Sequence, residues 1–304
     1  TLLQPCINHK CRHGVCKNIF MNNFANYIGE VKAKHGVFSF CHFDEFIGLS
    51  MREYGEFSEI ELSLMLKFIM KDDVVFDIGA NIGAFTVPFA KKVGDFGEIY
   101  SFEPQKLIYE ILHENVNKNK LKNVKVFNIG VGKKEEELEL NDIDYSKVGN
   151  FGGVSFKYES SSFTKNIKNK KYKVKVKNLD QLTEIKKCNF IKMDVEFMEL
   201  EILTGGKNFL KKFRPILWIE NHELYPNKIN KFLLENDYNA YWVYSTAFNK
   251  SNYFINDNNY FGELGTLNTL AIPIEDNRFS LDKKFDKIID HYSKPKIVLR
   301  ELFK

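Results

Sequence analysis

The chain has 304 residues, of which 44% are hydrophobic and 28% are charged. This length allows one large domain with a proper core, or one domain with appendages. The formal net charge is +4, and the isoelectric point of about 8.5 is lower than the values above ~9 that are typical of nucleic-acid-binding domains. No stretch reaches the ~18 uninterrupted apolar residues that a membrane helix needs, and no signal peptide is visible at Thr1. We therefore expect no nucleic-acid partner and no membrane span.

The five cysteines are distributed unevenly. Their odd number, with Cys41 and Cys188 standing alone, favours a reducing compartment and predicts a cytoplasmic location. An N-terminal group could offer four zinc ligands, namely Cys6, His9, Cys11 and Cys16. Its spacing matches no standard zinc pattern, so reduced cysteines in a surface arm are the favoured interpretation. We predict no bound metal.

The residue pattern divides the chain into two parts. Residues 1–71 are predicted to form an N-terminal extension and helical cap, with a mostly buried helix over residues 56–70. Residues 72–304 alternate strand-like and helical runs, which is typical of a Rossmann-like α/β domain with a mainly parallel sheet. Seven strands are expected, over residues 74–78, 99–103, 124–129, 190–194, 216–219, 238–244 and 267–272. Helices are expected over residues 83–93, 105–119 and 199–210, the last weakened by Gly205 and Gly206.

A polar excursion interrupts this alternation between residues 130 and 171. The glycine pair in residues 150–155 fits a loop that closes over substrate as well as it fits an ordinary tight turn. In residues 172–177, apolar residues alternate with lysines, which predicts a strand with one apolar face. A solvated strand protected by lysine is the favoured interpretation. The alternative is a docking face for an acidic substrate.

The central motif begins at Asp77, where a predicted strand runs into a loop containing Gly79, Asn81 and Gly83. Glycines let the backbone approach a ligand before the following helix. Asn81 replaces the middle glycine of the dinucleotide fingerprint. The Asp77 carboxylate would repel a pyrophosphate and would attract the ammonium group of a methionine moiety. The loop therefore favours S-adenosylmethionine over a nicotinamide nucleotide.

A second acid strengthens this interpretation. Glu103 ends the next predicted strand, twenty residues after Gly83. A carboxylate at that place can accept hydrogen bonds from both ribose hydroxyls of a nucleoside. Asp77, Gly79, Asn81, Gly83 and Glu103 are the predicted cofactor-binding residues.

At this point the sequence resembles the FkbM-type methyltransferase family. The matching segments are residues 77–83, 102–104, Asn115, Val116 and Asn119, Leu179 and Asp180, residues 191–196, Glu199, Leu203 and Gly205, and residues 214–220. The resemblance covers residues 74–223. It implies a class I methyltransferase fold, S-adenosylmethionine as methyl donor, and an oxygen acceptor on a sugar or natural product, although some relatives methylate nitrogen.

The sequence departs from the family pattern at Phe197, where a glycine would be expected. A ring just after the fourth strand of the methyltransferase domain could reshape the acceptor pocket, or it could accompany a loss of activity. We favour the reshaped pocket, because the neighbouring charged residues Lys192, Asp194 and Glu196 are all present.

Lys192, Asp194 and Glu196 alternate along a strand end, so we expect their side chains to point to the same side. Charges fit poorly in a buried strand unless they are paired or functional. A purely structural ion pair is the alternative. A third possibility is a divalent cation held by Asp194 with Glu220 and Asn221, which the resemblance does not require.

Methyl transfer to a hydroxyl is helped by a base, and His222 is the predicted candidate because its ordinary pKa lies near neutral pH. Asp194, Glu196 and Lys192 complete the predicted catalytic set. We therefore predict an S-adenosylmethionine-dependent methyltransferase with a class I α/β fold, a seven-stranded mainly parallel sheet and flanking helices. Its expected partner is a small-molecule or glycan acceptor. The alternatives are N-methylation of an amide or amine, a non-catalytic cofactor-binding or scaffold protein, and a nicotinamide dehydrogenase. The sequence does not indicate an oligomeric state.

Overall fold

The computed structural model describes residues 27–155, 167–222, 227–279, 281 and 285–295. The N-terminal group of Cys6, His9, Cys11 and Cys16 lies outside these residues. The remaining two cysteines, Cys41 and Cys188, are buried free thiols. Within the described segments, no helix has both the length and the apolar character needed to cross a membrane.

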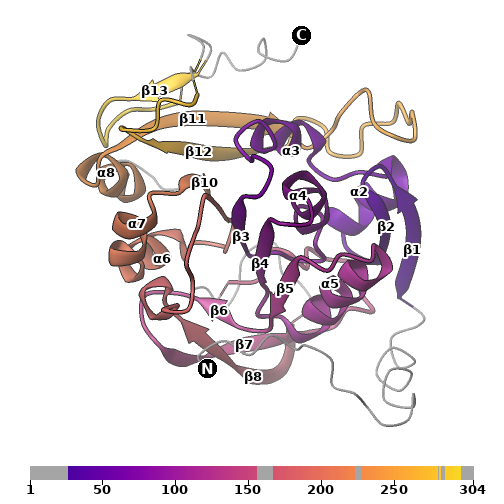
Figure 1. The fold of residues 1–304 in the computed structure, drawn as a ribbon. Coiled ribbons are helices and arrows are strands. Elements are labelled where there is room, and N and C mark those ends of the chain that lie inside the picture. The colour runs from indigo at the N-terminus through magenta and orange to yellow at the C-terminus, as the bar shows by residue number, and fades with distance from the viewer. Residues whose placement is uncertain (1–26, 156–166, 223–226, 280, 282–284, 296–304) are drawn as a thin grey trace.

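An eight-stranded sheet forms the centre of the molecule, with the strand order β13-β11-β12-β10-β9-β3-β4-β5 (Figure 1). Its strands are β3 (Val74–Ile78), β4 (Glu98–Phe102), β5 (Val124–Phe127), β9 (Phe190–Met193), β10 (Ile216–Glu220), β11 (Tyr238–Thr246), β12 (Gly265–Pro273) and β13 (Asp286–Ile288). The five strands from β10 to β5 are parallel, and β12, β11 and β13 add antiparallel pairings. The mainly parallel α/β fold is confirmed.

The predicted number of seven strands is too low by one. β13 is the additional strand, and it pairs antiparallel with β11 through three residues. A segment of three residues is too short to show the period-two alternation by which strands are predicted.

Successive residues of the central strands face opposite sides of the sheet, and both sides are covered by helices. Val75 packs with the cluster that includes α3 (Glu59–Met65) and α4 (Thr86–Val93), while Phe76 packs with the cluster that includes α6 (Glu199–Gly205) and α7 (Lys207–Phe213). α5 (Lys106–Lys118) lies on the side of α3 and α4, and α8 (Lys228–Glu235) lies on the side of α6 and α7. The strands are therefore apolar on both faces.

The helix predicted over residues 199–210 is two helices, α6 and α7, separated at Gly206. A Cβ atom at Gly205 would lie 2.5 Å from the carbonyl oxygen of Lys133. The glycine pair thus permits a close approach of the loop after β6, which a continuous helix with side chains would prevent.

The N-terminal part contains elements that the residue pattern did not predict. A hairpin of β1 (Ile28–Ala33) and β2 (Gly36–Cys41) is followed by α2 (Ile47–Tyr54). The predicted helix over residues 56–70 is confined to α3. The Asn115 side chain accepts a hydrogen bond from the Ser39 amide at 2.6 Å and donates to the Ser39 carbonyl at 3.0 Å, so it joins α5 to β2. The division of the chain at residue 71 stays a prediction.

The excursion contains a second sheet, with the order β6-β8-β7. Its strands are β6 (Gly130–Val131), β7 (Glu136–Ile143) and β8 (Ile167–Lys177). The predicted strand over residues 172–177 is confirmed as the end of β8, with Val174 and Val176 buried. Lys173 forms an ion pair with Glu137 of β7 at 3.5 Å, so a neighbouring acidic strand partly balances the lysine face.

The order of the parallel strands decides where a ligand can bind. From β3 the chain proceeds through β4 and β5 to one edge of the sheet, and it returns to β9 on the other side of β3. The strand order therefore reverses between β3 and β9. Ligands of open α/β sheets bind at such a switch point, beyond the carboxyl ends of the strands.

Candidate active site at the carboxyl ends of the central strands

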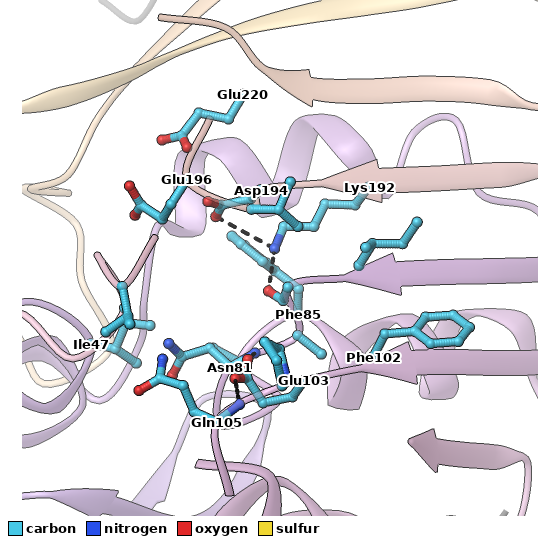
Figure 2. Close-up of a pocket in the computed structure, with 18 of the residues that line it drawn as sticks. Ile47, Asn81, Phe85, Phe102, Glu103, Gln105, Lys192, Asp194, Glu196 and Glu220 are labelled. Carbon is cyan, nitrogen blue, oxygen red and sulfur yellow. Dashed lines mark hydrogen bonds and ion pairs between the residues drawn. The ribbon is translucent and has the colours of Figure 1, made fainter. Parts of the chain in front are cut away.

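A cavity of about 310 Å³ lies at this switch point. Residues at and just after the carboxyl ends of β3, β4, β9 and β10 line it, together with Ile47 of α2, Asn150 and Gly152 of the excursion, and residues 264–266 at the start of β12. Figure 2 shows Glu103, Gln105 and Asn81 on one side of this space and Asp194, Glu196 and Glu220 on the other. We call these sides the nucleoside end and the acidic end.

The glycine loop after β3 has the tight geometry that its sequence predicted. Gly79 has a φ of 76°, and a Cβ atom there would lie 1.8 Å from the Asp194 carbonyl oxygen. Gly83 has a φ of 87°, and its Cβ would meet Leu112 of α5 at 2.7 Å. Only glycine adopts such conformations without strain. Gly79 and Asn81 line the cavity, whereas Gly83 packs against α5 and does not.

Glu103 joins the ends of β4 and the glycine loop. Its Oε2 atom accepts a hydrogen bond from the Asn81 amide at 2.9 Å, and Oε1 accepts one from the Gln105 amide at 2.8 Å. The side chain lines the cavity, and burial raises its pKa to about 7. A carboxylate has about four lone-pair directions, so two remain for the hydroxyls of a ribose.

Asp77 does not lie where the sequence analysis placed it. It is 0% exposed and does not line the cavity. Its Oδ2 atom accepts a hydrogen bond from the Thr86 hydroxyl at 2.6 Å, and Oδ1 lies 3.5 Å from the Lys192 ammonium. The expected contact with the ammonium group of a methionine moiety is therefore corrected to an indirect role, in which Asp77 fixes Lys192 beneath the loop.

Lys192 connects the two ends of the cavity. Its buried ammonium donates a hydrogen bond to the Gly79 carbonyl at 2.8 Å and lies 3.4 Å from Asp194 Oδ2, as the dashed lines in Figure 2 show. Asp77 and Asp194 raise the pKa of Lys192 against the opposing effect of burial, so the side chain stays charged. The structure thus brings together Lys192 and Asp194, as predicted.

Three carboxylates gather at the acidic end. Asp194, Glu196 and Glu220 each place one oxygen atom within 4.8 Å of the other two. Burial and mutual repulsion raise the pKa of Glu196 to about 9 and that of Glu220 to about 8. These three residues are the ones that could hold a cation. Asn221, the third member of the cation site considered from the sequence, is buried and donates to Asn230 and Thr269 instead.

His222 lines the cavity and forms an ion pair with Glu220, with 2.8 Å between Nε2 and Oε1. This contact raises the pKa of His222 to about 9, so the imidazole is protonated at neutral pH. A protonated imidazole cannot accept the proton of a hydroxyl. The structure therefore makes the Asp194 carboxylate, which lines the cavity beside Lys192, a better candidate for the base than His222, the predicted one.

Phe197 is not a wall of the cavity, contrary to the expectation for the residue that replaces the family glycine. Its ring is 37% exposed and packs 6.0 Å from the His222 ring, between centroids. Its φ of 76°, next to a φ of 54° at Glu196, lies in the left-handed region. The glycine preference at this position has a backbone cause, because a side chain there is strained.

Several residues of the site were missed by sequence reasoning. Gln105 accepts a hydrogen bond from the Tyr145 hydroxyl at 3.0 Å and donates to the Phe151 carbonyl at 2.8 Å, which ties the excursion to the end of β4. Asn115 also donates to the Ile82 carbonyl at 2.8 Å and so supports the glycine loop from α5. The match of Asn115 to the family motif was the available signal, but its role depends on tertiary contacts.

Comparison with known proteins assigns the chain to a family. The Methyltransferase FkbM domain model matches residues 77–240, which is more than half of the chain. The chain belongs to the FkbM methyltransferase family. This membership confirms the predicted family, the class of enzyme and S-adenosylmethionine as the cofactor of the domain.

Individual relatives are more distant. The hexuronic acid methyltransferase AglP of Haloferax volcanii is 26% identical over 183 residues, which are 57% of this chain and 66% of AglP. The crystal structure of Methyltransferase FkbM from Methylobacillus flagellatus KT superposes with a TM-score of 0.42 and 16% identity, over 66% of this chain and 44% of that one. M. jannaschii TYW2 in complex with AdoMet superposes with a TM-score of 0.39 and 14% identity, over 86% of this chain and 87% of that one. The chain thus spans just under two thirds of AglP and less than half of the Methylobacillus protein.

Proposed function

We propose that the FkbM-family chain transfers the methyl group of S-adenosylmethionine to a hydroxyl group of a glycan, glycoconjugate or natural product. The observation that carries this proposal is the two-ended cavity. Glu103 at the end of β4 and the carboxylates beyond β9 and β10 line one space, with the glycine loop of β3 between them. With ~4.8 Å between neighbouring strands, β4 and β10 lie about 14 Å apart, enough for a nucleoside with an extended arm.

The residues at the nucleoside end fit this cofactor. Glu103 retains acceptor capacity for two ribose hydroxyls, and the backbone at Gly79 is open to close approach because a Cβ atom is absent. When bound, the cofactor supplies an electrophilic methyl group on a sulfonium. The role of the protein is to orient both reactants and to exclude water. Orienting the reactants lowers the entropic cost of the reaction.

At the acidic end, Asp194 is the group best placed to take a proton from an acceptor hydroxyl. Ionised carboxylates only accept hydrogen bonds and therefore suit a ligand with several hydroxyls. The relative AglP is named for methylation of a hexuronic acid, which supports a sugar acceptor. A cytoplasmic location, expected from the free thiols, stays part of the proposal.

Two measurements test this function. The mass of any small molecule that purifies with the protein should correspond to S-adenosylmethionine or S-adenosylhomocysteine. Incubation with methyl-labelled cofactor and a panel of glycans, peptides and lipids should label a glycan hydroxyl. Asp194→Asn should reduce labelling by at least tenfold while leaving adenosylhomocysteine affinity unchanged. Labelling of only peptides or lipids would reject the glycan acceptor, and a bound nicotinamide nucleotide would reject methyl transfer.

A further inference from the structure

The charges at the acidic end do not balance. Asp194, Glu196 and Glu220 line it together with two cations, Lys192 and His222, among the described residues. Both cations are already engaged. Lys192 is shared between Asp194 and the buried Asp77, and His222 is paired with Glu220. With Asp77 beneath the loop included, four acidic side chains therefore share two cations.

The excess is visible at the level of single atoms. The Oε2 atom of Glu220 is buried and has no hydrogen-bond partner among the described residues. A buried carboxylate oxygen without a partner is costly, and the cost is relieved by a proton or by a cationic group. The raised pKa values of Glu196 and Glu220 are the expected consequence of this crowding.

We infer that the acidic end makes the enzyme select acceptors that present an uncharged hydroxyl and carry no carboxylate, so that its sugar acceptor differs from the hexuronic acid of AglP. This inference rests on the proposed function and specifies its substrate class. A carboxylate placed ~4 Å from an uncompensated negative charge is repelled, and the repulsion is stronger in a partly buried site than in water. A neutral or amino sugar meets no such penalty.

The direction in which charge moves during the reaction favours the same arrangement. The acceptor oxygen forms a bond to the methyl carbon with its lone pair as the carbon–sulfur bond breaks, and that bonding pair goes to sulfur. Positive charge thus would move from sulfur to the acceptor oxygen, and the hydroxyl proton would then pass to the carboxylate of Asp194. Carboxylates at the place where positive charge develops stabilise the transition state more than the ground state.

Matched sugars test the selectivity. We would measure kcat/KM for transfer of labelled methyl groups to methyl glucoside, methyl glucosaminide and methyl glucuronide, which differ in charge but share a ring. The glucoside or the glucosaminide should exceed the glucuronide by at least tenfold. Glu196→Gln and Glu220→Gln should reduce this ratio. Glu98→Gln makes the same charge change at the start of β4, away from the cavity, and should leave the ratio unchanged.

A second readout needs neither acceptor nor cofactor. In the free protein, nuclear magnetic resonance titration should place the pKa of His222 near 9, above its ordinary value of 6.5, and Glu220→Gln should lower it by at least one unit, which would confirm the ion pair between the two side chains. A glucuronide that is methylated as well as the neutral sugars would overturn the inference. A stimulation by Mg²⁺ that EDTA reverses would also overturn it, because the carboxylates would then hold a metal.

The outcomes separate the inference from the proposed function. Methylation of the glucosaminide at its amine alone would support exclusion of carboxylates and would reject the hydroxyl acceptor. If none of the three sugars is methylated while adenosylhomocysteine still binds, the glycan acceptor fails, and the substrate class inferred from it fails with it.

Discussion

The two ends of the cavity satisfy their acids in opposite ways. At the nucleoside end, Glu103 accepts hydrogen bonds from two backbone amides that are part of the glycine loop and of the start of α5. At the acidic end, Glu220 retains a buried oxygen without a partner among the described residues. The first end is held in place by the main chain before any ligand arrives. The second end stores electrostatic repulsion that a ligand or a proton must relieve.

This difference shows where the protein tolerates an unfavourable buried charge. Unsatisfied buried charge is rare in protein interiors and is concentrated at functional sites. Lys192 lies between the two ends of the cavity, because its ammonium contacts the loop carbonyl of Gly79 as well as Asp194. Substitutions at the nucleoside end and at the acidic end should therefore affect different properties of the protein.

The largest effect is expected at Lys192, between the two ends of the cavity. Lys192→Met should lower the free energy of unfolding by about 3–5 kcal/mol, because two carboxylates lose their shared counterion. Chemical denaturation measures this change. Lys211→Met, at an exposed position on α7, is the control and should change stability little. A loss below about 1 kcal/mol at Lys192 would mean that the two ends are not coupled through this residue.

At the nucleoside end, the main effect should be on binding. Glu103→Ala should weaken adenosylhomocysteine binding by about 1.5–3 kcal/mol, since hydrogen bonds to a charged acceptor are lost. Isothermal calorimetry at neutral pH measures the affinity. Glu98→Ala, at the other end of the same strand, should bind normally. Equal affinity in both variants would place the ribose elsewhere.

At the acidic end, removal of charge should stabilise the fold. The pKa of Glu196 is raised from 4.5 to about 9, so the folded state holds a proton that the unfolded state releases as pH rises above 4.5. Stability therefore decreases between these pH values, and the penalty is fully present above the folded pKa.

Glu196→Gln removes this titration. The variant should gain about 1–2 kcal/mol over the parent at pH 8 and little at pH 5, while its activity falls. Thermal unfolding at both pH values tests the difference, with the exposed Glu235→Gln as control. A gain that does not depend on pH would argue against charge repulsion as the cause.

The smallest effect concerns the backbone at Phe197. Phe197→Gly and Phe197→Ala both remove the ring, but only glycine relieves the left-handed conformation. The glycine variant should therefore be more stable than the alanine variant by about 1 kcal/mol. Both should bind adenosylhomocysteine as the parent does, because the ring does not line the cavity. Equal stability of the two variants would show that the backbone relaxes without strain.

Sequence reasoning predicted the parts of the site that depend on local order. The bounds of β3 and the positions of Gly79 and Glu103 follow from a strand, a tight turn and a helix in succession, and such patterns are readable within a few residues. The direction of the Asp77 side chain was not readable in this way. It depends on Lys192, more than a hundred residues later in the chain, which fills the space next to it.

The same limit applies to Phe197 and to the N-terminal hairpin. A glycine-like position can be recognised from the family pattern, but whether its side chain enters a pocket depends on φ and on the neighbours that pack around it. The strands β1 and β2 have no regular alternation, and β2 is fixed by Asn115 of α5. Such contacts join distant segments and leave no local pattern in the sequence.

By itself, the sequence determined the α/β class, the glycine loop, the acid at the end of β4 and the family of this protein, because each of these is encoded by residues close together in the chain. Only the tertiary structure decided which acids face the cavity, that Asp77 is buried with Lys192, and that His222 is paired and protonated. The physical reason is that burial and charge repulsion depend on distances between side chains from β3, β9 and β10, and those distances exist only once the sheet has formed.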